Sequence, residues 1–99
     1  MEVKKCNSLE ETREQIDKID DKIVELIAIR NAYVKQLAHF KNSIEEIKAK
    51  DRIEDVINRM RARAIELDLS PNLINDIYIK MIDAMVESEV AEYKNAKNY

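Results

Sequence analysis

An apolar stripe runs without a glycine or proline from Leu9 to Phe40, and it constrains the fold more than any other feature. Its members recur in two offset series with heptad-like spacing, as in helices that pair with another helix. They are Leu9, Ile16, Ile23 and Leu37 in one series, and Ile19, Leu26, Tyr33 and Phe40 in the other. The stripe predicts a helix of about 34 residues, or about 50 Å at 1.5 Å per residue. A helix of that length needs a long partner, and we expect a second copy of the chain to supply it.

Composition supports an all-α fold. The 99 residues include no glycine and one proline, 45% are hydrophobic and 37% are charged, as expected of amphipathic helices. A formal net charge of −3 argues against a general nucleic-acid binder, and the apolar runs are too short to cross a bilayer. The first residues do not read as a signal peptide, and the single Cys6 is consistent with the cytoplasm. We therefore expect one cytoplasmic domain over residues 1–99, without a membrane or nucleic-acid partner.

Capping signals divide the chain into three helices. Ser8 and Glu11 form an S-x-x-E capping box before the long stripe. Asp51 is expected to cap the second helix, and Ser70 with Pro71 to end that helix and start the third. The expected helices span residues 8–41, 51–68 and 71–95, with a connecting loop at residues 42–50.

Arg30 occupies a position in the stripe that is otherwise apolar, and an unpaired buried cation there would be costly. Lys41 follows eleven residues later, on nearly the same side if the helix continues. Arg13 precedes Arg30 by seventeen residues, about 25 Å along the same helix, and so must come from another subunit to join them. Together the three cations predict a pocket for a small polyanion, shared between subunits.

Two further residues complete the candidate site. Arg52 lies at the start of the second helix, where its guanidinium would bind a carboxylate. Glu89 faces the apolar side of the third helix, so we expect a raised pKa and a protonated carboxyl that donates a hydrogen bond.

Simpler interpretations exist for these residues. Arg30 would also fit an interhelical salt bridge to Asp20 or Glu87, and Glu89 would also fit a solvent-facing carboxylate or one paired with a lysine. A non-catalytic dimerisation or regulatory module would keep the same fold. Such a module has no need of an arginine in an apolar seam, and the ordered set of cations therefore favours a binding pocket.

The ordered string R-x2-I-D-x-I-D-x2-I-x2-L-x3-R from Arg13 to Arg30, followed by Lys41 and Arg52, resembles the all-helical chorismate mutase family, which includes the isochorismate pyruvate lyases. The resemblance extends from about Ser8 to Tyr93. It implies an intertwined homodimer of three-helix chains with two sites per dimer, acting in the shikimate pathway and aromatic amino acid biosynthesis. It also implies a reaction that needs no cofactor and no metal.

The resemblance implies a role for each candidate residue. Arg13 from the other subunit, Arg30 and Arg52 would handle the carboxylates and ring face of the substrate. Lys41 and Glu89 would hydrogen-bond the ether oxygen on which negative charge grows as chorismate rearranges to prephenate.

Three positions depart from the usual mutase pattern. Glu89 replaces a glutamine, Ile53 stands where many mutases have a glutamate, and Ala49 stands where many have a loop aspartate. Ile53 and the eleven-residue step from Lys41 to Arg52 are also similar to the lyases, which convert isochorismate to salicylate and pyruvate. The sequence thus predicts a chorismate mutase, with an isochorismate pyruvate lyase as the alternative.

Overall fold

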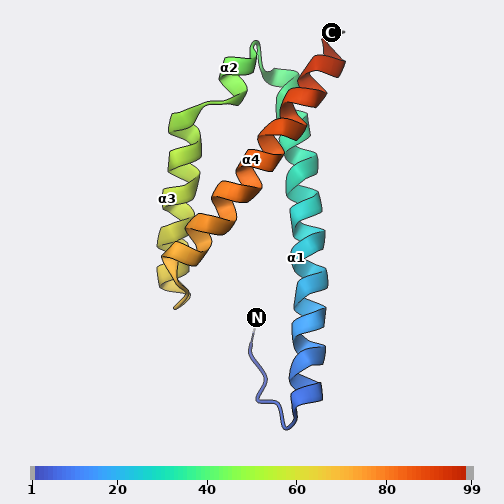
Figure 1. Cartoon of the computed structure of the whole chain (residues 1–99), viewed down its shortest axis with the longest axis vertical. Helices are drawn as coiled ribbons and strands as arrows, with labels where there is room; N and C mark the ends of the chain where they lie inside the picture. The colour runs from blue at the N-terminus through green and yellow to red at the C-terminus, as the bar shows by residue number, and fades with distance from the viewer. Residues whose placement is uncertain (1, 98–99) are drawn as a thin grey trace. The chain divides into compact units, whose positions relative to one another are not determined.

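The structure is a computed structural model and describes residues 2–97. Within those residues the secondary structure is entirely helical, which confirms the predicted all-α class with three long helices (Figure 1). A 3-10 turn and one short α-helix lie between the first and second long helices. The elements are α1 Leu9–Leu37, the 3-10 turn η1 Ala38–Phe40, α2 Ile44–Ile47, α3 Lys50–Glu66 and α4 Pro71–Ala96.

The chain divides into two compact units within α1: the first ends at Arg30 and the second begins at Asn31. In the first unit, the amide of Glu11 donates to Ser8 Oγ at 3.1 Å, and the amide of Asn7 donates to Glu11 Oε2 at 3.2 Å. The first bond satisfies an amide that the first helical turn leaves free, which confirms Ser8 as the predicted cap. The predicted role of Glu11 differs, because its carboxylate accepts from the residue before the cap and not from the cap itself.

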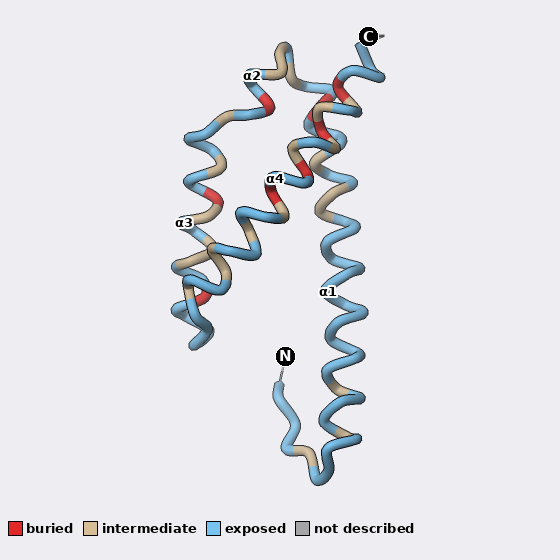
Figure 2. The backbone as a smooth tube through the Cα atoms, in the orientation of Figure 1, coloured by how far each residue is buried: buried red, intermediate tan, exposed pale blue. Residues whose placement is uncertain are grey.

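No residue of α1 is buried, and Figure 2 shows the helix mostly exposed, with a few half-buried positions. Large aliphatic residues of the predicted stripe are among the exposed ones, including Ile23 and Leu26. The apolar side chains of this helix are therefore largely uncovered within residues 2–97.

The first helix ends earlier than predicted. Its α-helical part stops at Leu37, η1 follows, and Lys41 has an extended backbone with φ −89° and ψ 146°. The predicted alignment of Lys41 with Arg30 assumed a continuous α-helix and is therefore wrong.

The predicted loop at residues 42–50 contains the short helix α2. Ser43 caps it, because its Oγ accepts a hydrogen bond from the amide of Glu46 at 3.2 Å. Asn42, Ser43 and Glu46 repeat the N-S-x-x-E pattern that begins α1, so the same capping signal was present here.

The second long helix begins one residue before the predicted cap. Ala49 is the N-cap of α3 and makes no side-chain capping bond, so the prediction for Asp51 is wrong. Asp51 instead lies in the first turn, where the helix dipole favours a carboxylate. Leu67 ends the helix, and Asp68 follows with φ 58°. The amide of Leu69 then returns to the carbonyl of Ala64 at 2.8 Å, as in a Schellman motif.

The third long helix begins as predicted and organises the second unit. Ser70 Oγ accepts from the amide of Leu73 at 3.2 Å, and Pro71 occupies the first turn. Within this unit α4 packs against α3, η1 and α2. One part of the core consists of the buried Ala38, Ile47 and Tyr93, with Ile44, Val86 and Val90 packed against them.

Candidate active site

Glu89 is the buried carboxyl of the candidate site. It lies on the face of α4 that also buries Ile82, Met85 and Tyr93, at helical spacing. Its side chain is 5% exposed, and Oε2 has no hydrogen-bond partner within residues 2–97. Burial raises the pKa of this carboxyl, as expected, because desolvation disfavours the charged form. The alternative of a solvent-facing Glu89 is thereby excluded.

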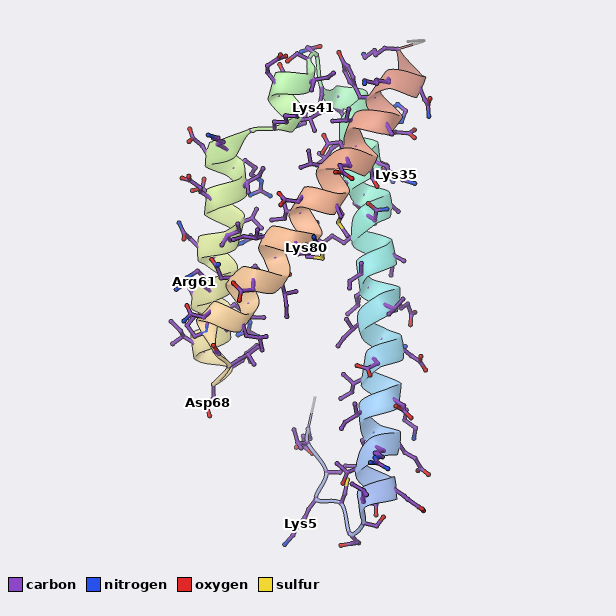
Figure 3. All side chains as sticks on the ribbon, in the orientation of Figure 1. Lys5, Lys35, Lys41, Arg61, Asp68 and Lys80 are labelled. Atoms are coloured by element: carbon purple, nitrogen blue, oxygen red, sulfur yellow. The ribbon has the colours of Figure 1, made fainter. Side chains whose placement is uncertain are left out.

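Lys41 is the cation associated with Glu89. Its positive charge opposes the effect of burial and lowers the pKa of Glu89, so the two groups are close enough to interact electrostatically. Lys41 lies half-buried between η1 and α2 (Figure 3), and its Nζ donates to the carbonyl oxygen of Glu46 at 3.1 Å. A carbonyl holds the ammonium without cancelling its charge, and it leaves further N–H donors for a ligand.

The backbone beside Lys41 has two side-chain contacts. Glu46 Oε2 accepts from the amide of Asn42 at 2.8 Å, and the hydroxyl of Tyr93 donates to the carbonyl of Asn42 at 3.0 Å. Glu46 and Tyr93 were not among the predicted site residues. The N-S-x-x-E pattern would have indicated Glu46, whereas the contact of Tyr93 joins residues 51 positions apart and has no local signal.

Arg13 and Arg30 belong to the first unit. Arg13 is exposed and Arg30 is half-buried, and α1 is continuous between them. They are therefore about 25 Å apart along the helix axis and do not meet in one chain. From this spacing the sequence predicts that Arg13 would reach the site from a second subunit.

Arg52 is exposed in the first turn of α3 and belongs to the second unit with Lys41 and Glu89. Ala49 is the N-cap of the same helix, and Ile53 is half-buried one residue after Arg52. The side chain of Ile53 has no hydrogen-bond acceptor, so this position lacks the one that a glutamate would provide.

Residues 2–97 contain no group of three or more histidine, cysteine or carboxylate side chains arranged to hold a metal ion. His39 Nε2 lies 3.1 Å from Glu92 Oε1 in an exposed pair. None of the described helices is both long and apolar enough to cross a membrane.

Comparison with known proteins identifies related sequences. The family model of chorismate mutase type II matches residues 12–90. A chorismate mutase of Methanocaldococcus jannaschii is 34% identical over 87 residues, which cover 87% of this chain and 84% of that protein. An isochorismate pyruvate lyase of Pseudomonas aeruginosa is 26% identical over 92 residues, covering 93% of this chain and 91% of the lyase. The chain therefore belongs to the chorismate mutase type II family.

Proposed function

We propose that this protein is a chorismate mutase, which rearranges chorismate to prephenate in a cationic pocket completed by a second subunit. The observation that carries the proposal is the buried Glu89, whose Oε2 has no hydrogen-bond partner within residues 2–97. Burial raises the pKa of this carboxyl, whereas the positive charge of Lys41 lowers it, and Lys41 is itself held by a neutral carbonyl that leaves its charge in place. Family membership supplies the reaction that these two residues would serve.

The reaction suits these residue types. In the [3,3] rearrangement a C–O bond breaks while a C–C bond forms, and negative charge develops on the ether oxygen. Lys41 donates a hydrogen bond to that oxygen, and Glu89 donates a second one when it is protonated. Donors oriented before the reaction stabilise developing charge, typically by a factor of about 10² to 10³ for one donor.

The arginines hold the substrate. Chorismate carries two carboxylates, and guanidinium groups bind carboxylates through paired hydrogen bonds. Arg30 and Arg52 bind it from one chain, and Arg13 comes from the other subunit. Holding the compact conformer brings the two reacting carbons together and removes part of the entropic barrier.

The shared site requires a homodimer. The exposed apolar residues of α1 support one, because a second copy of the same helix would cover them. In an antiparallel arrangement the Arg13 end of one helix would lie beside the Arg30 end of the other.

The direct test offers purified protein chorismate and isochorismate separately. We expect prephenate to form from chorismate. Salicylate and pyruvate from isochorismate, without prephenate from chorismate, would instead establish a lyase. Consumption of neither substrate would reject the enzymatic proposal and favour a non-catalytic dimerisation module.

The lyase alternative rests on Ile53. Its apolar side chain replaces the acceptor that many mutases offer to the hydroxyl of chorismate, and the lyase relative covers nearly the whole chain. The mutase remains the primary proposal, since the mutase relative is the more similar of the two. Replacing Ile53 with glutamate should raise the preference for chorismate over isochorismate if the site discriminates at this position.

A further inference from the structure

We propose that Glu46 and Tyr93 are positioning residues for Lys41, which together clamp the segment that carries its ammonium group. The inference rests on the proposed function for its effect on turnover. Its structural part, the ordering of Lys41, stands on contacts within the second unit alone.

Glu46 contacts three consecutive residues through three different groups. Its carbonyl oxygen accepts from Lys41 Nζ at 3.1 Å, its carboxylate accepts from the amide of Asn42 at 2.8 Å, and its own amide donates to Ser43 Oγ at 3.2 Å. A single residue therefore fixes the ammonium of Lys41 and the peptide group that follows it. The carboxylate is occupied by an amide, while the neutral carbonyl holds the cation.

Tyr93 fixes the next peptide group. Its hydroxyl donates to the carbonyl of Asn42 at 3.0 Å, while its ring is buried with Ala38 and Ile47. Tyr93 lies one helical turn after Glu89 on the same face of α4. The helix that supplies the buried carboxyl thus also holds the backbone beside the lysine.

The segment needs these contacts because its own backbone provides few. Lys41 is extended, and its amide makes only a long bond of 3.4 Å to the carbonyl of Ala38. The following helix α2 has four residues, too few to be stable by itself. Without Glu46 and Tyr93, Lys41 would sample many rotamers, and ordering it during the reaction would carry an entropic cost.

Two variants weaken the clamp while preserving the shape of the residues. Tyr93→Phe keeps the buried ring and deletes the hydroxyl that bonds Asn42. Glu46→Gln keeps the backbone carbonyl that holds Lys41 and replaces the charged acceptor of the Asn42 amide with a weaker, neutral one. Glu45→Gln is the matched control for the second, because Glu45 is an exposed neighbour in the same short helix. Circular dichroism at the assay temperature identifies conditions in which all variants are folded.

The first measurement is the order of the Lys41 ammonium, by ¹⁵N relaxation of its side chain. We expect lower order in Tyr93→Phe and in Glu46→Gln, and the wild-type value in Glu45→Gln. Unchanged order in both clamp variants would overturn the inference. This measurement needs no substrate, so it decides on the clamp even if the enzymatic proposal fails.

The second measurement separates kcat from KM for the substrate that the wild type converts. We expect kcat to fall about fivefold to tenfold in each clamp variant, the effect of weakening one hydrogen bond in the transition state, with KM within about twofold. A rise in KM at constant kcat would contradict positioning for catalysis. A wild type that converts neither substrate would reject the proposed function. An active wild type with equally active clamp variants would instead reject the role of the clamp in turnover and leave the proposed function standing.

Discussion

The long helices α1 and α4 differ in how they use their apolar faces. They have 29 and 26 residues, yet α4 buries Ile82, Met85, Glu89 and Tyr93, whereas α1 buries none. The face of α4 is covered by elements of its own unit. The difference teaches that periodicity reveals an apolar face, whereas it does not reveal what covers the face. For α1 we infer cover by a second copy of the chain.

The largest expected effect comes from placing a charge in the proposed seam of α1. Leu26→Glu would lose apolar burial and place a carboxylate in both copies of the interface. We expect dimer affinity to fall by about 10³-fold or more, at roughly 2–3 kcal/mol for each lost leucine contact. Sedimentation would show a monomer, and activity would be lost because Arg13 no longer reaches the other site.

Val24→Glu is the matched control for Leu26→Glu. The two side chains are similarly exposed in one chain, at 66% and 63%. Val24 lies about 200° around the helix from Leu26, outside the stripe. We expect this variant to remain dimeric. Equal dissociation by both variants would contradict the assignment of the stripe as the interface.

A second prediction concerns the charge in that face. Arg30→Leu completes the apolar series, so we expect equal or higher stability and a fall in kcat/KM of about 10² to 10³-fold. Arg59→Leu, an exposed change on α3, should leave turnover unchanged. A stabilised Arg30→Leu variant that keeps full activity would support a dimerisation module over an enzyme.

A third prediction addresses the buried carboxyl of α4. Glu89 donates a hydrogen bond only when protonated, and burial raises its pKa above the ordinary value of 4.5, with Lys41 opposing the shift. Activity should therefore fall as pH rises through that raised pKa, and Glu89→Gln should remove this dependence. A flat wild-type pH-rate profile from mildly acidic to mildly alkaline conditions would contradict the role of Glu89.

The same carboxyl makes stability depend on pH. A raised pKa in the folded state means that folding favours the neutral carboxyl. The neutral form therefore contributes to the free energy of unfolding at low pH, and this contribution is lost as pH rises through the folded pKa. Above that pH, Glu89→Gln should therefore be more stable than the wild type in urea denaturation. Glu87→Gln, an exposed change on the same helix, should change neither the pH dependence of activity nor the stability at high pH.

The smallest expected effect comes from removing the serine caps of α1 and α4. Ser70→Ala should lower the free energy of unfolding by about 1 kcal/mol, the usual contribution of a serine cap, because α4 holds the core of its unit. Ser8→Ala should cost only about 0.3 kcal/mol, because the first turn of α1 is exposed and opens locally. Equal losses in urea denaturation would show that both helix starts belong to one cooperative unit.

Local signals predicted most of the helices. The caps at Ser8 and Ser70 were correct, since a hydroxyl and a nearby free amide need no distant partner. The predicted helix through Lys41 was wrong, because apolar spacing continues across a 3-10 turn without marking it. Asp51 satisfied the cap pattern, yet α3 began one residue earlier at Lys50.

The residues of the candidate site also differ in whether the sequence indicated them. The sequence indicated Glu89 and the direction of its pKa, because an acid on an apolar helix face is desolvated wherever that face is buried. It did not indicate Tyr93, whose hydroxyl donates to the carbonyl of Asn42. Tyr93 does not interrupt a periodic pattern, so only the packed structure distinguishes it.

The sequence by itself determined the all-α class, two of the helix starts, the family and the ordered set of cations, because these depend on spacing along one chain. Only the tertiary structure decided that Lys41 leaves the first helix and that its charge acts on the buried Glu89. It also placed Tyr93 on the backbone next to that lysine. The physical reason is that helix periodicity is a local property, whereas desolvation and hydrogen bonding between distant segments depend on which surfaces the fold brings together.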